Sequence, residues 1–277
     1  MMKILVTGSA GFIGFHTAKF FLKKGHQVFG LDNLNRYYDV NLKKARNKIL
    51  LRFKNYNFKK ININSFKKVE KFFLKNKFDL VIHLAAQAGV RYSLKNPSVY
   101  IDTNLRGFFN IIENCKKNNI KKFIYASSSS VYGVNKNKFF KETDSAVSPI
   151  QLYAATKRSN ELIAHAYSSL YKMNTIGLRF FTVYGPWGRP DMSFFLFTKK
   201  ILNNEIIDIF NFGKHVRDFT YIDDVVRGIF LCSKKNLKKS TNNQLFKIVN
   251  IACGKPVKLI NFISIIEKKL NKNLKKI

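Results

Sequence analysis

The sequence contains a tyrosine, a lysine and a run of serines whose types and spacing suit acid–base chemistry. Tyr153 and Lys157 are four residues apart, so on a helix both side chains lie on one face. The serines at 127–130 directly follow an apolar run, which predicts a position at the end of a strand. Because a nearby ammonium lowers the pKa of a phenol from about 10, such a tyrosine can act as a general base.

A glycine-rich turn near the N-terminus predicts a nucleotide-binding site. Gly8, Gly11 and Gly14 follow a short apolar strand and open directly into a helix. Glycines let the backbone approach a pyrophosphate, which the N–H groups and dipole of the helix N-terminus attract. The second predicted strand ends at Asp32, whose carboxylate can accept hydrogen bonds from ribose hydroxyls and repel a 2′-phosphate. The pattern favours NAD over NADP, and Arg36 is the residue that argues for the alternative.

These two features predict one reaction when they are combined. With the ammonium of Lys157 and a positively charged nicotinamide nearby, we expect the pKa of Tyr153 to fall toward neutrality. Tyr153 would then take a hydroxyl proton while hydride leaves the same carbon for NAD. The residues at 84–86 are small enough to pass close to the cofactor, and Asn104 is interpreted as a structural polar group rather than a ligand.

The elements that must position these residues alternate between short apolar runs and longer amphipathic stretches, which is typical of parallel βαβ units. Strands are predicted at 3–7, 27–31, 57–61, 80–84, 122–127, 175–180 and 247–251. Helices are predicted at 12–24, 65–75, 97–118, 152–172 and 222–233, with Ser65 as an N-cap and Pro97 in a first turn. The alternation breaks from 182 to 214, where a second, smaller domain is expected to begin. The predicted fold class is α/β, a Rossmann-type doubly wound parallel sheet with a smaller C-terminal substrate domain.

Composition limits the classes of protein that the chain can belong to. Its 277 residues are 46% hydrophobic, which excludes wholesale disorder. Fifty Lys and Arg against sixteen Asp and Glu give a net charge of +34, which at first suggests a nucleic-acid partner. The lysines are scattered in doublets along the whole chain, however, and this spread is typical of a solvated surface. We therefore expect neither a nucleic-acid nor a membrane partner.

The cysteines and the apolar runs point to a cellular location. The three cysteines are far apart and suggest neither a disulfide framework nor a metal site. We see no signal peptide and no run of about 18 apolar residues. A cytoplasmic protein is expected.

The motifs in the chain resemble those of the NAD-dependent epimerase/dehydratase family, the extended short-chain dehydrogenase/reductases. Within it, the chain is most similar to the UDP-glucuronate 4-epimerases, over residues 1 to about 265. The stretches that carry the resemblance are 32–39, 85–93, 179–192 and 217–224. The resemblance implies a tightly held NAD, a UDP-hexuronate substrate and a homodimer built on the helices near 98–118 and 152–171.

The resemblance also assigns individual residues to the site. Ser128, Tyr153 and Lys157 match the catalytic triad of the family. The expected cofactor contacts are Gly8, Gly11, Phe12, Ile13, Gly14, Asp32, Asn33, Asn35, Asn62, Ile63, Leu84, Ala85, Ala86, Gln87, Asn104, Ser127, Tyr153, Lys157 and Phe181. The expected substrate contacts are Arg91, Ser128, Ser129, Thr182, Arg189, Phe210, which matches the strand against which uracil packs, and Arg217, which matches an arginine that binds the diphosphate. The domains implied are an NAD-binding domain at 1–180 with a return segment at 218–253, and a nucleotide-sugar domain at 181–217 and 254–277.

The expected reaction makes a demand on the substrate pocket. Oxidation of C4 of a glucuronate gives a ketone beside the carbon that carries the carboxylate, and such a β-keto acid readily loses CO₂. An epimerase must therefore hold the carboxylate, and Arg189 and Thr182 are the candidates for that grip. Related dehydratases and decarboxylases carry acidic residues where this chain has Ser129 and Ser130, so simple epimerisation of UDP-glucuronate to UDP-galacturonate is favoured. The alternative enzyme is a neutral-sugar 4-epimerase of the UDP-glucose type.

Two departures from the family pattern leave a further alternative open. Asn62 stands where the family usually has an acidic residue that contacts adenine. The sequence ends at Ile277, whereas the family continues, so the substrate domain is expected to be truncated. A truncated NAD-binding protein without turnover is therefore the alternative from another class.

Overall fold

The centre of the protein is a parallel sheet whose strand order creates a crevice for ligands. The computed structural model describes residues 1–134, 139–207, 209, 213–235, 237 and 245–272. The strand order is β3-β2-β1-β4-β5-β6-β9, and every pair is parallel. The strands are β1 (Lys3–Thr7), β2 (Gln27–Asp32), β3 (Tyr56–Lys60), β4 (Leu80–His83), β5 (Lys122–Ser128), β6 (Asn174–Phe180) and β9 (Phe246–Ile251). The chain order reverses between β1 and β4, and open α/β sheets bind ligands at such a switch point, outside the carboxyl ends of the strands.

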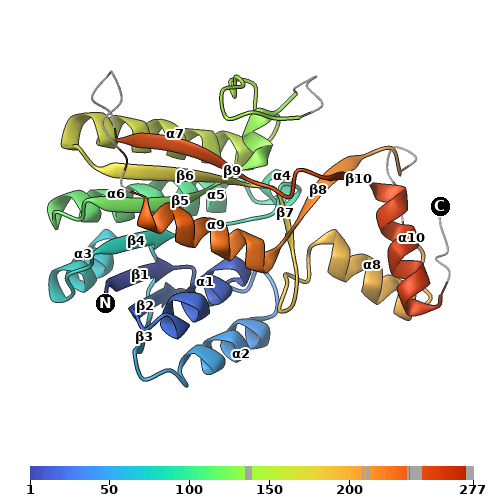
Figure 1. Cartoon of the computed structure of the whole chain (residues 1–277), viewed down its shortest axis with the longest axis horizontal. Coiled ribbons are helices and arrows are strands. Elements are labelled where there is room, and N and C mark those ends of the chain that lie inside the picture. The colour runs from blue at the N-terminus through green and yellow to red at the C-terminus, as the bar shows by residue number, and fades with distance from the viewer. Residues whose placement is uncertain (135–138, 208, 210–212, 236, 238–244, 273–277) are drawn as a thin grey trace.

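Helices cover both faces of this sheet and close two hydrophobic cores (Figure 1). One face is covered by α1 (Phe12–Lys23), α2 (Val40–Leu50) and α9 (Ile222–Lys234). The other is covered by α3 (Phe66–Lys75), α6 (Gly107–Lys117) and α7 (Leu152–Tyr171). The central strands are apolar on both faces because both are covered; in β1, for example, Ile4, Leu5 and Val6 are fully buried. The short elements between these are α4 (Tyr92–Lys95), α5 (Ser98–Tyr100), η1 (Ile101–Arg106) and η2 (Ser129–Tyr132).

A smaller unit lies beyond the carboxyl edge of the large sheet, on the right of Figure 1. Its sheet has the order β10-β8-β7, with β7 (Thr182–Tyr184), β8 (Val216–Tyr221) and β10 (Pro256–Lys258). The helices α8 (Ser193–Leu202) and α10 (Leu259–Leu270) pack against each other there. A third hydrophobic cluster, which includes Ile201, Phe262 and Ile263, holds them together.

The structure confirms the predicted doubly wound sheet and its elements. All seven predicted strands exist, with bounds within one residue of those expected. The helix predicted at 97–118 is present, but it is built from α5, a π-helical segment at Ile101–Arg106 and α6. Ser65 stands at the N-cap of α3 without a capping hydrogen bond from its side chain. The helices α2, α4, α8 and α10 and the small sheet were not predicted from the sequence.

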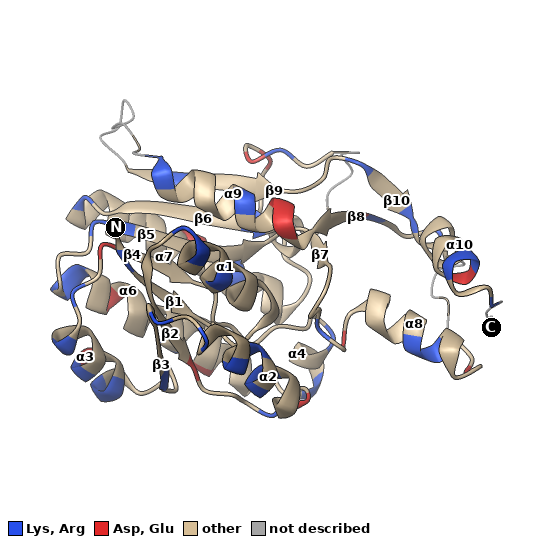
Figure 2. Cartoon of the chain, turned by 60° about the horizontal axis from the view of Figure 1, so that its bottom comes forward, with Lys and Arg blue, Asp and Glu red and all other residues tan. Residues whose placement is uncertain are grey.

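Basic residues are spread over the molecule. In Figure 2, Lys and Arg fall on α1, α2, α3, α6, α8, α9 and α10 and are not gathered on one of these elements. This is the distribution expected of a solvated surface. Among the described residues, no helix is both long and apolar enough to cross a membrane.

Candidate active site

A cleft with a volume of 1350 Å³ lies at the carboxyl edge of the large sheet. Its wall includes residues that follow β1, β2, β4 and β5, such as Gly8, Asn33 and Ser129. Residues of β7 and β8 in the small sheet also line it, among them Thr182 and Arg217. The cleft is therefore placed where both units can contact one ligand.

The glycine-rich turn fits a pyrophosphate because its backbone is packed too tightly for side chains. Gly8 has a φ of +71°, and a Cβ there would lie 2.8 Å from the backbone nitrogen of Ala85. A Cβ at Gly14 would lie 2.0 Å from the carbonyl oxygen of Gly8. The N-cap residue of α1, Gly11, makes no side-chain cap, so the first N–H groups of the helix are left to an anion. The turn meets the requirements of a dinucleotide site.

Asp32 ends β2 as a buried carboxylate beside this turn. Its side chain accepts hydrogen bonds from the backbone N–H groups of Ala10 (3.1 Å) and Leu34 (2.8 Å). Burial raises the pKa of Asp32, while the Leu34 N–H and the ammonium of Lys43 act in the opposite direction. Arg36 is exposed and does not contribute to the wall of the cleft. Asp32 is therefore the residue placed to favour a ribose with a free 2′-hydroxyl over one that carries a 2′-phosphate.

The predicted triad comes together at the end of β5 and on the first turns of α7. The Lys157 ammonium donates to the carbonyl of Ala126 (2.9 Å), and burial lowers its pKa to about 8. The Ser128 side chain hydrogen-bonds with Tyr153. Ser128 Oγ also accepts from the backbone N–H of Ser130 (3.2 Å), which fixes its position. Ser128, Tyr153 and Lys157 all line the cleft, so a phenol, a hydroxyl and an ammonium face one space.

The electrostatics of Tyr153 differ from the expectation. We expected Lys157 to lower the pKa of this phenol, whereas burial raises the pKa of Tyr153 above its ordinary value. The groups that lower it are the hydrogen-bonded Ser128 and the positive charge of Arg189. This effect of Arg189 was not predicted from the sequence, because Arg189 is far from Tyr153 along the chain.

A buried ion network lies beneath the serines. Glu161 on α7 accepts from Ser127 Oγ (2.6 Å) and, through both carboxylate oxygens, from Nε and Nη2 of Arg179 (2.8 Å each). Arg158 donates a further bond of 2.8 Å. Glu161 is fully buried, and the bonds to these donors keep its pKa below the usual value. The network joins α7 to β5 and β6 directly below Ser128.

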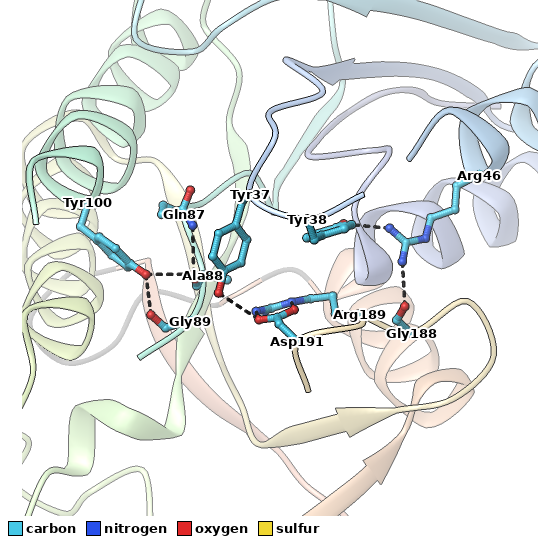
Figure 3. Close-up of polar contacts among 10 residues, drawn as sticks. All are labelled: Tyr37, Tyr38, Arg46, Gln87, Ala88, Gly89, Tyr100, Gly188, Arg189 and Asp191. Atoms are coloured by element: carbon cyan, nitrogen blue, oxygen red, sulfur yellow. Dashed lines mark hydrogen bonds and ion pairs between the residues drawn. The ribbon is translucent and has the colours of Figure 1, made fainter. Parts of the chain in front are cut away.

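The chain after β4 is held from behind by two polar side chains. Asn104 accepts from the N–H of Gln87 (2.8 Å) and donates to its carbonyl (3.1 Å) and to Thr156 (3.2 Å). The Tyr100 hydroxyl contacts the carbonyl of Ala88 at 2.9 Å (Figure 3). Asn104 thus positions the backbone of Gln87, and it is not part of the wall of the cleft.

Most of the residues predicted for the site lie on the wall of the cleft. These are Gly8, Phe12, Ile13, Gly14, Asp32, Asn33, Asn35, Ile63, Leu84, Ala85, Ala86, Gln87, Arg91, Ser127, Ser128, Ser129, Tyr153, Lys157, Phe181, Thr182, Arg189 and Arg217. Gly11, Asn62 and Asn104 are not part of it. Gly11 closes the turn by donating to the Gly8 carbonyl (2.9 Å), and Asn62 is exposed and accepts from the N–H of Asn64 (3.0 Å). Phe210 is outside the described residues.

Several residues at the cleft were not predicted. Arg189 forms a bidentate ion pair with Asp191, and the Tyr37 hydroxyl donates to the same carboxylate (3.0 Å). Lys43 donates to the carbonyl of Asn35 (2.8 Å). The sequence gives a partial signal for Asp191, since it stands two residues after Arg189, but none for its contact with Tyr37, 154 residues away.

Comparison with known proteins places the chain among nucleotide-sugar enzymes. The NAD dependent epimerase/dehydratase family matches residues 4–252. Protein CapI of Staphylococcus aureus is 49% identical over 99% of this chain and 85% of its own length. A probable UDP-glucuronate 4-epimerase of Rhizobium meliloti is 44% identical over 96% of this chain and 82% of its own. The crystal structure of UDP-glucuronic acid 4-epimerase from Bacillus cereus, in complex with UDP-glucuronic acid and NAD, is 35% identical with a TM-score of 0.90, covering 100% of this chain and 85% of that one.

Proposed function

Since this chain belongs to the NAD dependent epimerase/dehydratase family, we propose that it uses NAD to invert C4 of UDP-glucuronate, giving UDP-galacturonate. The observation that carries the proposal is the convergence of Ser128, Tyr153 and Arg189 on one cleft with the glycine turn. A proton acceptor, a cation for a carboxylate and a dinucleotide cradle are the parts that this reaction requires.

The residues that would hold NAD are those of the turn and the strand ends around it. The backbone at Gly8 and the N-terminus of α1 suit the pyrophosphate, and the Asp32 carboxylate suits a ribose. When bound, NAD supplies a hydride acceptor for C4 that later returns the hydride.

The acid–base work falls to Tyr153. Its phenolate takes the proton of the C4 hydroxyl. After the 4-keto sugar has rotated and presents its opposite face to the hydride, Tyr153 returns the proton to the C4 oxygen. Burial raises the pKa of Tyr153, and the Ser128 hydroxyl and the Arg189 cation oppose this shift and so favour the phenolate. The Lys157 ammonium, bound to the Ala126 carbonyl, adds a positive charge to the same wall of the cleft.

Arg189 and Thr182 hold the carboxylate at C5. Arg189 and Tyr153 line the same cleft, so the guanidinium would lie on the wall that faces the sugar. A guanidinium that holds the carboxylate keeps the bond between C5 and the carboxylate carbon out of alignment with the π system of the ketone. This orientation opposes the loss of CO₂. The segments 181–217 and 254–277, with Arg217 on the cleft, would bind the UDP moiety.

The experiment is turnover by the purified chain. NAD retained through purification is measured first, and UDP-glucuronate is then added while proton NMR follows the C4 epimer. Formation of UDP-galacturonate supports the proposal. Faster epimerisation of UDP-glucose would instead favour the neutral-sugar enzyme, and retained NAD without any epimer would favour a protein without turnover. Tyr153→Phe keeps the ring and should bind NAD but abolish turnover.

We also propose that the protein is a homodimer. Large apolar side chains are exposed on the η1–α6 segment, at Ile101 and Phe109, and on α7, at Leu162 and Leu170. The helices α6 and α7 pack side by side, so these residues can form one surface (Figure 1). Sedimentation equilibrium of the NAD-loaded protein measures the mass directly.

We propose a cytoplasmic location on the basis of the cysteines. Cys115 and Cys232 are buried free thiols, and Cys253 is an exposed one. Free thiols persist where the compartment is reducing.

A further inference from the structure

The loop 185–191, which carries Arg189, is held on both sides of that residue by side chains from a single segment, 37–46. We propose that Tyr37 and Arg46 are positioning residues that aim Arg189 and thereby set the preference of the cleft for a sugar that bears a carboxylate. This inference rests on the proposed function, because it concerns the group that Arg189 would grip.

Arg46 forms the clamp on the N-terminal side of Arg189. It is fully buried on α2, and its five N–H groups have five contacts, all with neutral oxygens. Nε and Nη2 donate to the carbonyl of Trp187 (3.1 and 2.6 Å), and Nη2 also donates to Gly188 (3.0 Å). Nη1 donates to the carbonyl of Ala10 (3.1 Å) and to the Tyr38 hydroxyl (2.8 Å), and Figure 3 shows the side chain between Tyr38 and Gly188.

The backbone at Trp187 explains why the loop needs this clamp. Trp187 has a φ of +60°, a left-handed conformation that is costly for a bulky side chain. Trp187 is 41% exposed, so burial of this residue is a weak restraint. The two hydrogen bonds from Arg46 to the Trp187 carbonyl hold this conformation in place.

Tyr37 forms the clamp on the C-terminal side. Its hydroxyl donates to Oδ2 of Asp191 (3.0 Å), and Asp191 accepts from Arg189 through both carboxylate oxygens. Figure 3 shows the three side chains in contact, with Tyr37 reaching down from the segment after β2. Burial and the charge of Asp191 raise the pKa of Tyr37 to about 12, so the phenol stays protonated and remains a donor.

The two clamps fix Arg189 before a substrate arrives. A free arginine side chain loses rotamer entropy when it binds, and fixing it in advance removes that loss from the binding step. The benefit is specific, because a carboxylate uses the aimed guanidinium and a neutral hydroxymethyl group does not. Loss of a clamp should therefore weaken the binding of UDP-glucuronate more than the binding of UDP-glucose.

The test compares the affinities of these two ligands by titration calorimetry on NAD-loaded protein. Tyr37→Phe removes only one hydroxyl and leaves the ring. Its matched control is Tyr167→Phe, which removes a phenol that donates to the Glu113 carboxylate (2.7 Å) on the far helices α6 and α7. We expect Tyr37→Phe to lower the ratio of the two affinities about five- to tenfold. The control should leave the ratio unchanged.

Arg46→Met is the second variant, and it should lower the ratio further. Arg46→Lys should not restore it, because one ammonium lacks the planar fork that reaches Ala10, Tyr38 and the loop together. NAD content is measured in each variant, since Arg46 also touches the glycine turn.

The outcomes separate this inference from the proposed function. A wild-type protein without preference for UDP-glucuronate would show that the proposed carboxylate grip is wrong, and the inference would fall with it. A wild-type preference that survives in Tyr37→Phe and Arg46→Met would overturn the inference alone. An equal loss of affinity for both ligands would also overturn the inference, because a merely structural role of Tyr37 and Arg46 predicts that result.

Discussion

Removing the charge of Glu161 should strongly destabilise the fold. The carboxylate accepts four hydrogen bonds, from Ser127, from two nitrogens of Arg179 and from Arg158. The side chain of Arg179 is 3% exposed, whereas that of Arg158 is 29% exposed and can turn to water. In Glu161→Gln a single oxygen remains as acceptor, and Arg179 becomes a buried cation without a counter-ion. Breaking a buried pair in this way costs about 3–5 kcal/mol.

The assay is equilibrium unfolding in urea at pH 7, with the NAD content held equal between variants. The double variant Glu161→Leu with Arg179→Met is the control for coupling. Replacing both partners by apolar side chains removes the unpaired charge, so the double variant should lose less stability than Glu161→Gln alone. A loss below about 1 kcal/mol for Glu161→Gln would equal that of a surface pair and would refute the reasoning.

Two further predictions concern the cofactor turn and acid stability. Gly14→Ala would place a Cβ 2.0 Å from the Gly8 carbonyl oxygen, so the purified variant should lose its retained NAD and about 1–3 kcal/mol of stability; wild-type NAD content, measured by absorbance after denaturation, would contradict this. Burial lowers the pKa of His83 from 6.5 to about 3, and between these values the unfolded chain binds a proton that the folded chain does not. The free energy of unfolding should therefore fall as the pH falls through this window, by about 2 kcal/mol from His83 at pH 5. His83→Gln should show a correspondingly smaller drop between pH 7 and pH 5 in urea titrations, and an equal drop would refute the assignment.

The sheet was predictable because its strands carry their own signal. Ile4, Leu5 and Val6, for example, are fully buried in a sheet that is covered on both faces, so an apolar run followed by a glycine-rich turn is enough to place β1. The glycine turn and Asp32 follow from local spacing in the same way. The position of the serines at the ligand-binding edge follows from the rule that parallel strands end at one edge, whereas the assignment of Ser128 and Tyr153 to one triad came from the family resemblance.

The missed features depend on partners that are distant in sequence. The helix α2 looks like a solvated lysine-rich stretch, yet Lys43 and Arg46 are buried in it. Backbone carbonyls from residues 10, 187 and 188 satisfy Arg46, and no local pattern reveals them. The small sheet was missed for a related reason, since β7, β8 and β10 are short and pair across long intervals of sequence.

The most direct test of the proposed mechanism is epimerisation of UDP-glucuronate by the NAD-loaded protein in D₂O. A hydride that leaves C4 and returns to C4 never exchanges with water, and Tyr153 exchanges only the hydroxyl proton. We predict UDP-galacturonate that carries no deuterium on carbon, with its C4 and C5 proton signals at full intensity in the NMR spectrum. Deuterium at C5 with the C4 proton retained would show only that the ketone exchanges its neighbouring C5 proton with solvent. Deuterium at C4 would show that the C4–H bond breaks by proton transfer to solvent and not by hydride transfer, and this result would contradict epimerisation through a transient 4-ketone.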